Sequence, residues 1–390
     1  MSGIYIHIPF CERFCNYCSF FSTKGLKDKD RFLQAIIKEI SLKSACNLIN
    51  KECRTLYIGG GTPSYFGAEG IGQIVEALNK HFNLSALEEF TVELNPNDVS
   101  PVLARDFKTM GVNRISMGVQ SFFDKHLVWM NRRHSSAEAF AAYDILRGAG
   151  FSNISIDLIF GFGLLSSNEW EENLKTVVML SPEHISAYQM SIEPGSKLGI
   201  MYKRGEYEPS SDEICANEYA KLMDALSKAG YLQYEVSNFA KSKALVSKHN
   251  SSYWSGVSYL GFGPGAHSFY GGTRSWNKPV LKKYCDYYLE QQSEYFSKDR
   301  CVDNIVTGFE VLSQKDIFNE KIMLGLRTCN GVDVRELEKF YSSLFNSIKY
   351  NLNALLLSGK LASNQNFIFI PRDKFFISDA IIRELFVSSN

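Results

Sequence analysis

One stretch decides how the rest of the chain is interpreted: Ile4-Tyr5-Ile6-His7-Ile8-Pro9-Phe10-Cys11-Glu12-Arg13-Phe14-Cys15-Asn16-Tyr17-Cys18. Its first part, residues 4–8, is a short apolar run rich in isoleucine, which is typical of a buried strand. Its second part places three cysteines in the spacing CxxxCxxC. The stretch therefore predicts a strand that leads directly into a metal-binding loop. In barrels of parallel strands, functional loops follow the carboxyl ends of the strands.

The three cysteines, Cys11, Cys15 and Cys18, are close enough on one loop to hold three corners of an iron–sulfur cluster. A 4Fe–4S cluster held in this way keeps one iron without a protein ligand, where a cosubstrate can bind. A structural zinc ion would need a fourth ligand, either His7 or a distant cysteine, and a redox pair would need only CxxC. The spacing resembles that of the radical SAM superfamily. This resemblance implies that S-adenosyl-L-methionine chelates the open iron through its amino and carboxylate groups.

The composition of the chain indicates which partners and which cellular compartment to expect. Its 390 residues include 42 Lys and Arg and 42 Asp and Glu, so the formal net charge is zero. Without a basic excess, nucleic acid is not expected as a partner. Nine cysteines, an odd number, favour a reducing compartment. Because no apolar run approaches the roughly 20 residues of a membrane span, we expect a cytoplasmic protein without a transmembrane segment.

Strand-like and helix-like segments alternate along the first half of the chain. The strand-like runs are residues 4–8, 55–58, 90–94, 114–117, 154–159 and 185–190. The helix-like stretches between them include residues 31–44, 71–82, 101–110, 137–148 and 170–180. This alternation indicates parallel strands joined by right-handed crossovers. The fold class predicted is α/β, with a partial (β/α)6 TIM-type barrel.

Polar residues recur where these strands end, which predicts one shared site. The polar residues are Thr62, Glu93, Gln120, Asp157 and, farther along a loop, Arg132, and they are accompanied by the glycines Gly60 and Gly61. Successive glycines let the backbone approach a ligand closely, although an ordinary tight turn would use them too. The polar side chains offer acceptors, donors and a cation suited to hydroxyls, an ammonium and a carboxylate. Each also has an ordinary interpretation as a loop charge or helix cap. Asp157 is the best supported, because an unpaired carboxylate inside an apolar run would be costly.

The second half of the chain carries weaker signals. Residues 212–230 have a helical pattern, residues 253–276 are interpreted as an ordered loop, and residues 367–371 predict a strand. We divide the chain into the partial barrel at 1–200 with the cluster loop at 11–18, a barrel completion with a second motif region at 201–304, and a small winged-helix-like domain at 305–390. A winged helix does not by itself imply DNA binding.

With these segments in view, the chain resembles the oxygen-independent coproporphyrinogen III oxidase family and its heme-chaperone relatives over nearly its whole length. The matching segments are residues 5–11 (YIHIPFC), 59–64 (GGGTPS), 93–96 (ELNP), 118–122 (GVQSF) and 157–161 (DLIFG). By that resemblance S-adenosyl-L-methionine is held by Gly60, Gly61, Thr62, Glu93, Gln120, Arg132 and Asp157, with Tyr5 packed nearby.

Two features separate the branches of this family. The oxidases carry a fourth cysteine where this chain has Phe20, and an N-terminal extension that is missing before Ile4. Residues 249–254 instead read HNSSYW, which looks like the HNxxYW signature of the heme-chaperone branch. A histidine beside aromatics suits heme, because imidazole can ligate the iron while rings pack on the macrocycle. His249 is thus the expected heme ligand, although a lone histidine more often satisfies local hydrogen bonds. His267 is a weaker alternative.

The resemblance implies a heme chaperone that binds heme and delivers it to acceptor hemoproteins, such as respiratory-chain components. The cluster and S-adenosyl-L-methionine would then serve assembly or regulation, with a homodimer as one arrangement, and we expect no coproporphyrinogen oxidase activity. The alternative is a coproporphyrinogen III dehydrogenase of porphyrin biosynthesis, which would use a radical for oxidative decarboxylation. A radical SAM enzyme acting on another tetrapyrrole is a third hypothesis.

Overall fold

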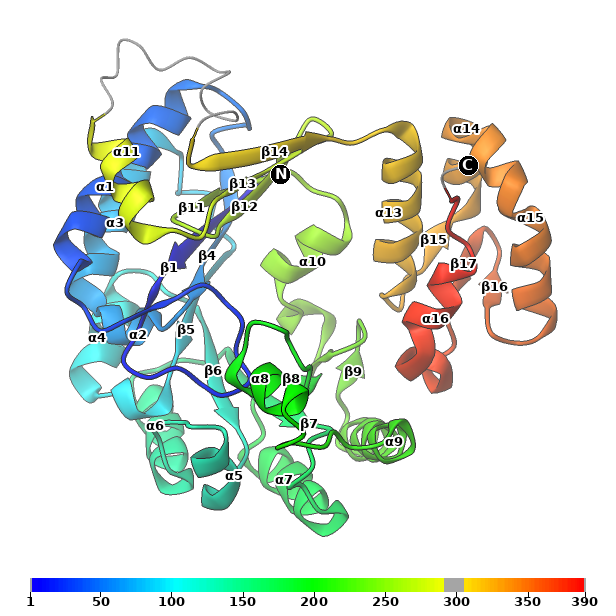
Figure 1. Cartoon of the computed structure of the whole chain (residues 1–390), viewed down its shortest axis with the longest axis horizontal. Helices are drawn as coiled ribbons and strands as arrows, with labels where there is room; N and C mark the ends of the chain where they lie inside the picture. Colours follow the sequence, from blue (N-terminus) through cyan, green and yellow to red (C-terminus); the bar gives the residue numbers. More distant parts are fainter. Residues whose placement is uncertain (1, 291–304, 389–390) are drawn as a thin grey trace.

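A twelve-stranded sheet forms the body of the protein in a computed structural model that describes residues 2–290 and 305–388 (Figure 1). Its centre is a run of six parallel strands that neighbour one another in chain order. These strands are β1 (Ser2–Ile8), β4 (Cys53–Gly60), β5 (Glu89–Leu94), β6 (Arg114–Gln120), β7 (Ile154–Phe160) and β8 (His184–Gln189). All six predicted strands are therefore confirmed, and so is the partial barrel.

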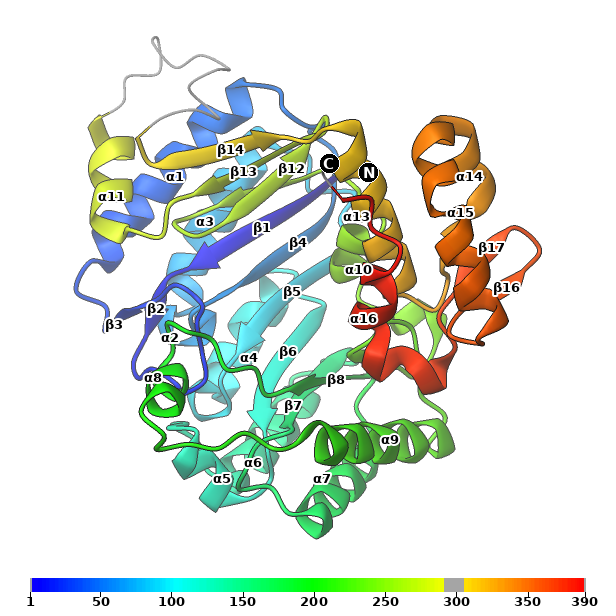
Figure 2. The ribbon, with the colours of Figure 1, turned by 45° about the vertical axis from the view of Figure 1, so that its right-hand side comes forward.

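Helices cover the outer face of these strands (Figure 2). The long crossover helices are α1 (Lys29–Ala45), α3 (Ala68–His81), α4 (Pro101–Thr109), α6 (Ser136–Gly148) and α7 (Ser167–Leu180), each within three residues of its expected bounds. Ser100, Ser135 and Ser166 cap α4, α6 and α7 by accepting a backbone N–H. Shorter segments between them are β2 (Phe10–Cys11), β3 (Thr23–Lys24), α2 (Pro63–Phe66), η1 (Pro96–Asp98) and α5 (Asp124–Trp129).

The two faces of the strands differ sharply in chemistry, because successive side chains point to opposite sides. On β6, Ile115 and Met117 belong to the apolar core under the helices. Arg114 and Ser116 alternate with them and face the inside of the barrel, where they line a cavity. The same alternation on the neighbouring strands makes the inner face polar. Its cavity-lining members on the other strands include Tyr57, Glu93, Asp157, Ser186 and Tyr188.

The interpretation of residues 253–276 as an ordered loop was wrong. Three strands lie there or at its edge: β11 (Tyr259–Phe262), β12 (His267–Tyr270) and β13 (Thr273–Asn277). β11 pairs in parallel with β1, and β12, β13 and β14 (Thr307–Val311) follow in antiparallel order. The runs are only four or five residues long, too short for an alternation to stand out. The hairpin between β12 and β13 turns at Gly271 and Gly272, both with positive φ.

A short helix closes the end of the barrel opposite to the cysteine loop. This helix, α10 (Lys248–Trp254), carries the HNSSYW segment. Glu89, at the start of β5, accepts hydrogen bonds from the backbone N–H groups of Lys248 (2.7 Å) and His249 (3.0 Å). The buried carboxylate therefore caps the helix and offsets the positive end of its dipole.

The remaining elements extend the sheet at its other edge and build a small C-terminal unit. Beyond β8 lie α8 (Lys197–Lys203), α9 (Asp212–Lys228), β9 (Leu232–Gln233), β10 (Asn238–Ala240), η2 (Lys243–Leu245) and, after the hairpin, α11 (Leu281–Glu290). The C-terminal unit holds α13 (Gln314–Leu326), α14 (Val334–Phe340), α15 (Ser342–Leu357), η4 (Arg372–Ile377), α16 (Ser378–Arg383) and the antiparallel strands β15 (Val332–Asp333), β16 (Ala362–Asn364) and β17 (Phe367–Phe369).

The strand predicted at residues 367–371 is thus β17, within the expected helical unit with its small sheet. β14 lies past the predicted boundary at 305 but pairs with β13 of the large sheet. The division of the chain at 200 and 304 stays a prediction. Within residues 2–290 and 305–388, no helix combines the length and the apolar character needed to cross a membrane.

Candidate functional site

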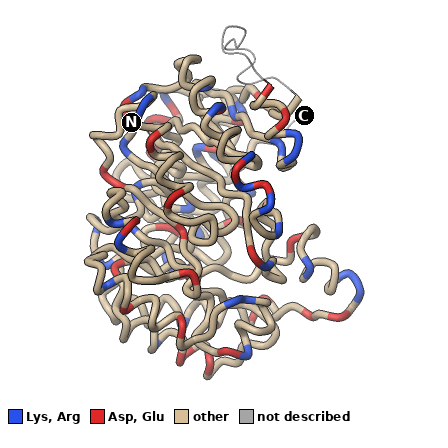
Figure 3. Tube along the Cα trace, turned by 90° about the vertical axis from the view of Figure 1, so that its left-hand side faces the viewer, with Lys and Arg blue, Asp and Glu red and all other residues tan. Residues whose placement is uncertain are grey.

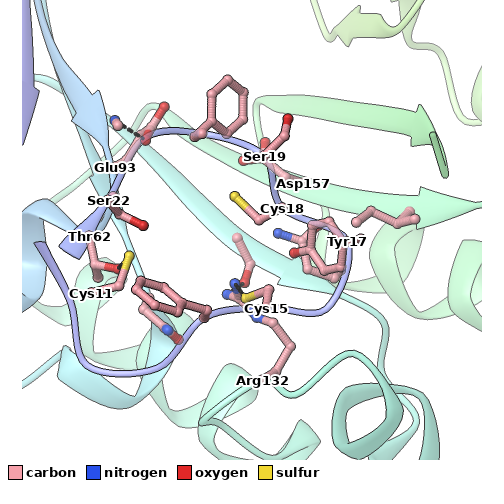
Figure 4. A pocket seen from close by; sticks show the side chains of 18 of the residues that line it. Cys11, Cys15, Tyr17, Cys18, Ser19, Ser22, Thr62, Glu93, Arg132 and Asp157 are labelled. Atoms are coloured by element: carbon pink, nitrogen blue, oxygen red, sulfur yellow. Dashed lines mark hydrogen bonds between the residues drawn. The ribbon is translucent and has the colours of Figure 1, made fainter. Parts of the chain in front are cut away.

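The cysteine loop runs between two short paired strands at the carboxyl end of β1. Thr23 N–H bonds to the Pro9 carbonyl (2.7 Å) and Gly25 N–H bonds to the Cys11 carbonyl (2.9 Å), which closes the loop at its base. Figure 4 shows the sulfur atoms of Cys11, Cys15 and Cys18 around one open space. The loop thus brings the three thiols to one side of the cavity, as the spacing predicts.

The chemistry of the three thiols suits a cluster. Burial raises the pKa of Cys11, and it raises that of Cys18 to about 11. A metal must therefore displace protons to bind there. Among the residues that the structure describes, no three His, Cys, Asp or Glu side chains converge closely enough to chelate a single ion. Three thiols on one loop can take three corners of an iron–sulfur cluster, whereas a structural zinc ion would need a fourth ligand.

The turn that follows α5 contacts the cysteine loop from the other side. Asn131 adopts a left-handed conformation (φ 59°) and donates a side-chain hydrogen bond to the Phe14 carbonyl (2.7 Å). Asn16 N–H bonds to the Met130 carbonyl (3.0 Å). This turn also places Arg132, whose Nη1 donates to the Cys15 sulfur (3.4 Å) and whose Nη2 donates to the Gly118 carbonyl (2.5 Å). The same turn therefore holds the cysteine loop in place and positions the Arg132 guanidinium beside it.

The glycine segment at the carboxyl end of β4 lies in close contact with its neighbours. A Cβ on Gly61 would lie 2.7 Å from the Phe10 carbonyl oxygen, and one on Gly59 would lie 2.8 Å from the Glu93 carboxyl group. Gly60 has φ 110°, a conformation that L side chains rarely adopt. Next to it, the Thr62 hydroxyl donates to the Cys11 sulfur (3.3 Å). The segment needs glycine for close contact, as expected beside a ligand site.

Glu93 is held by two donors within the barrel. The Tyr57 hydroxyl donates to Oε1 (2.7 Å) and the Gly60 N–H donates to Oε2 (3.1 Å), the contact drawn as a dashed line in Figure 4. Burial raises the pKa of Glu93 to about 7, against the lowering effect of these bonds. The carboxyl group is therefore poised between its neutral and charged forms near neutrality, and a bound cation would favour the charged form.

Asp157 lies opposite, on β7. The Ser116 hydroxyl lies within 3.3 Å of both carboxylate oxygens, and the Ser155 hydroxyl within 3.3 Å of Oδ1. Burial raises the pKa of Asp157. Gln120 ends β6 in a left-handed conformation (φ 69°), where the pairing with β7 shifts register. A ligand between Glu93 and Asp157 would meet acceptors on two sides.

A cavity of about 1170 Å³ joins these residues. It is lined by the three cysteines and by seven of the residues predicted to hold S-adenosyl-L-methionine: Gly60, Gly61, Thr62, Glu93, Gln120, Arg132 and Asp157. Tyr5 does not line it. Its ring stacks on Tyr57 (centroids 6.1 Å apart) and its hydroxyl lies 3.2 Å from His7 Nδ1, so it packs behind the cavity wall.

His249 lies away from this cavity, in the layer that α10 closes. Its ring is fully buried, with Nδ1 2.9 Å from the Thr55 hydroxyl and Nε2 2.8 Å from the Tyr253 hydroxyl. Burial lowers the pKa of His249 to about 3, so the imidazole is neutral. Both ring nitrogens are engaged, and a metal could reach Nε2 only if Tyr253 moved. The weaker alternative, His267, stacks on Trp276 in the β12–β13 hairpin (5.9 Å).

Sequence reasoning missed two residues of the inner face, Tyr57 and Arg114. Tyr57 orients Glu93, and Arg114 lines the cavity deep in the barrel. Both stand at inward positions of predicted strands, alternating with Leu56, Ile58 and Ile115. The alternation within each strand was the signal that would have found them, since a large polar residue between core residues must face another environment.

Comparison with known proteins agrees with this geometry. Residues 5–177 match the Radical SAM superfamily. The heme chaperone HemW of Bacillus subtilis is 33% identical over 95% of this chain and 95% of its own length. The chain belongs to the HemW family. Another HemW, from Lactococcus lactis, is 32% identical over 96% of the chain and 94% of its own length. A mitochondrial relative from Danio rerio, radical S-adenosyl methionine domain-containing protein 1, is 31% identical over 87% of the chain and 76% of its own length.

Among solved structures, coproporphyrinogen III oxidase (HemN) from Escherichia coli has a TM-score of 0.82 to this chain. It covers 99% of this chain and 90% of its own length at 22% identity, so the likeness establishes the fold. This structure confirms the predicted fold, and the family model and the HemW relatives confirm the resemblance drawn from the sequence motifs. The cysteine triad and the polar inner face are what this fold places at one end of the barrel.

Proposed function

We propose that this protein binds heme and delivers it to acceptor hemoproteins, with a 4Fe–4S cluster and S-adenosyl-L-methionine held at the carboxyl ends of the barrel strands. The observation that carries the proposal is the match to heme chaperones along 95% of the chain. The fold alone would suit an oxidase equally well, because a fold hosts many functions.

The residues of the large cavity fit the two proposed cofactors. Cys11, Cys15 and Cys18 would ligate three irons, and the cavity of about 1170 Å³ leaves room for a nucleoside beside them. A reduced cluster with bound S-adenosyl-L-methionine can supply a deoxyadenosyl radical. Arg132 offers a fork for a carboxylate, while Glu93 and Asp157 offer acceptors for an ammonium and for hydroxyls.

Phe20 supports the chaperone over the oxidase. It stands where the oxidases carry a fourth cysteine, and its side chain is 72% exposed at the rim of the cavity. An exposed phenyl ring supplies neither a metal ligand nor a proton donor. An apolar ring at a cavity mouth instead favours contact with an apolar ligand or a protein partner.

His249 is our proposed heme ligand, and the structure sets a condition on it. The Tyr253 hydroxyl must leave Nε2 before iron can bind there. In the His249→Ala variant, the absorption of bound heme should change while the cluster absorption stays as in the parent. Unchanged heme absorption would remove His249 from the proposal.

The proposal as a whole is tested under anaerobic conditions. After reconstitution of the cluster, the protein receives S-adenosyl-L-methionine with either heme or coproporphyrinogen III. Stable heme binding, transfer to an apo-hemoprotein and no decarboxylated product are expected. Protoporphyrinogen formed together with 5′-deoxyadenosine would instead identify a coproporphyrinogen III dehydrogenase.

We place the reaction partners in the cytoplasm, with respiratory-chain hemoproteins as expected acceptors and a homodimer as the expected regulated form. Acidic and basic residues are interspersed along the side shown in Figure 3, in keeping with a formal net charge of zero. Because this protein has no net charge, we expect its clients to bind through shape and apolar contact more than through long-range charge.

A further inference from the structure

Arg114 is a buried cation whose hydrogen bonds are not accounted for. Its side chain is 1% exposed on the inner face of β6, in the layer nearest to α10. Its Nε and Nη1 atoms are buried and have no hydrogen-bond partner among residues 2–290 and 305–388. A guanidinium that is removed from water without partners carries a large free-energy cost, so its presence in a cavity needs an explanation.

The neighbouring carboxyl groups do not fill this role. The charge of Arg114 lowers the pKa values of Glu93 and Asp157, but burial outweighs it and both pKa values stay raised. Glu93 accepts from Tyr57 and Gly60 instead, and Asp157 lies within bonding distance of serine hydroxyls. Arg114 thus influences them through space, with Nε and Nη1 left for another acceptor.

A second cavity lies next to this layer, between the barrel, α10 and the C-terminal unit. Its volume is about 410 Å³, and Tyr188, Gln189 and Asn250 line both it and the large cavity. The two cavities therefore lie next to each other and share part of their walls. Tyr253, Trp254 and Phe376 give the second cavity aromatic walls. Arg114, which lines the large cavity, shares that cavity's wall with these three junction residues.

Together these features describe a site for a flat apolar body that carries an acidic group. Aromatic walls suit the faces of a planar macrocycle. A guanidinium whose buried Nε and Nη1 have no partner suits a carboxylate, because a carboxylate oxygen can accept a charge-assisted hydrogen bond from either nitrogen. Only Asn250, Tyr253 and Trp254 of the HNSSYW segment face these cavities, while His249 lies behind Tyr253.

We propose that Arg114 binds a carboxylate of the cargo, a heme propionate, while the macrocycle packs in the second cavity against Tyr253, Trp254 and Phe376. This inference rests on the proposed function and specifies how its ligand is oriented. The propionate would cross the junction at Asn250 and reach the guanidinium within the barrel. Acidic macrocycles would then be selected over their esters.

The test compares heme with its dimethyl ester, which keeps the macrocycle and the iron but loses both carboxylates. Dissociation constants are measured for the cluster-loaded parent and for Arg114→Gln, Arg114→Lys and Arg327→Gln. Arg327 lines the second cavity and pairs with Asp379 at its rim, so it is the matched alternative cation. Iron content and circular dichroism confirm that each variant carries its cluster and is folded.

The parent should bind heme about tenfold or more tightly than the ester, as a charge-assisted hydrogen bond predicts. Arg114→Gln should bind both ligands equally, Arg114→Lys should keep part of the preference, and Arg327→Gln should keep all of it. A preference that survives in Arg114→Gln, or that disappears in Arg327→Gln alone, would overturn the role of Arg114. If the parent binds both ligands equally, the role of Arg114 is also overturned, because water would then satisfy the guanidinium. If the parent binds neither heme nor its ester, the proposed function itself is wrong.

Discussion

The carboxyl group of Glu93 links ligand binding to pH. Its pKa of about 7 means that, at neutrality, roughly half of the molecules carry a proton there. The charged carboxylate accepts hydrogen bonds from the ligand's amino group and hydroxyls better than the neutral acid does, so binding of S-adenosyl-L-methionine should release that proton at lower pH. Its affinity should therefore fall about tenfold per pH unit below 7 and level off above it.

Calorimetry between pH 6 and pH 8 checks this prediction, with two buffers of different ionisation enthalpy to count released protons. Glu93→Gln should bind more weakly at pH 8 and lose the pH dependence. Asp157 also has a raised pKa. A pH dependence that persists in Glu93→Gln but vanishes in Asp157→Asn would assign the proton to the other carboxyl group.

Cys15 should be indispensable to the cluster, whereas Cys53 should not. Cys15 lies in the loop with its sulfur 3.4 Å from Arg132, while Cys53 is fully buried at the start of β4. Reconstituted Cys15→Ala should hold little iron. Cys53→Ala should keep the iron content of the parent and lose about 1 kcal/mol of unfolding free energy. Iron analysis with visible absorption distinguishes them, and full iron loading of Cys15→Ala would contradict the triad.

Residue-level prediction succeeded where a side chain had to be explained by its place in a strand. Asp157 interrupts an apolar run, and that interruption pointed to the cavity that it lines. His249 was less tractable. The motif shows which residue types lie together but not that Thr55, far away in the sequence, occupies one of its ring nitrogens. Contacts between residues far apart in the sequence depend on how the strands pair, which cannot be read from the sequence alone.

At the scale of elements, α10 depends on a single carboxylate. Glu89 accepts from the N–H groups of both Lys248 and His249. Glu89→Gln replaces one acceptor by a donor, so it should cost about 1–3 kcal/mol of unfolding free energy and expose the amides of α10 to exchange. Thermal denaturation and hydrogen exchange measure both effects.

The neighbouring Glu88 provides the control. Its carboxylate is exposed and forms ion pairs with Arg54 and Lys248 at the surface. Surface pairs of this kind contribute little, so Glu88→Gln should behave like the parent in both experiments. Equal effects from the two substitutions would mean that general charge, and not the cap, stabilises α10.

The elements of the first half were predictable because each has a long apolar pattern and a distinct turn. Those of residues 253–276 were not. β12 and β13 span four and five residues, and only Gly271-Gly272 marks the hairpin between them. The strands of this region are stabilised by pairing with strands distant in the sequence: β11 pairs with β1, and β13 pairs with β14. Such pairing overrides weak local preference.

At the scale of the whole molecule, buried ionisable groups set the dependence of stability on pH. Three imidazoles have pKa values lowered to between about 3 and about 4 by burial: His7, His134 and His249. Three carboxyl groups have pKa values raised to about 7 by burial: Glu93, Glu218 and Glu235. The unfolded chain binds more protons than the folded chain at the imidazoles below pH 6.5, and fewer at the carboxyl groups between pH 7 and 4.5.

The two sets therefore oppose each other on acidification to pH 4.5. Four further imidazoles, those of His81, His126, His184 and His267, have lowered pKa values, whereas Asp157 adds one further carboxyl group with a raised pKa, so the imidazoles outweigh the carboxyl groups. Stability should therefore fall gradually from pH 6.5 to about pH 4.5 and more steeply below it, where the carboxyl groups no longer offset the imidazoles. Urea unfolding at a series of pH values measures this. A steep loss that begins at pH 6.5 would mean that the carboxyl groups do not keep their protons in the folded protein.

The polar inner face of the barrel has a thermodynamic consequence. A ligand that enters the large cavity trades hydrogen bonds with water for hydrogen bonds with Glu93, Arg132 and Asp157, and covers little apolar surface. Heat capacity should then change little on binding of S-adenosyl-L-methionine, and the enthalpy should be favourable. A macrocycle against the aromatic walls of the second cavity should instead give a clearly negative heat-capacity change. The temperature dependence of the binding enthalpies of S-adenosyl-L-methionine and of heme would thus distinguish the two cavities.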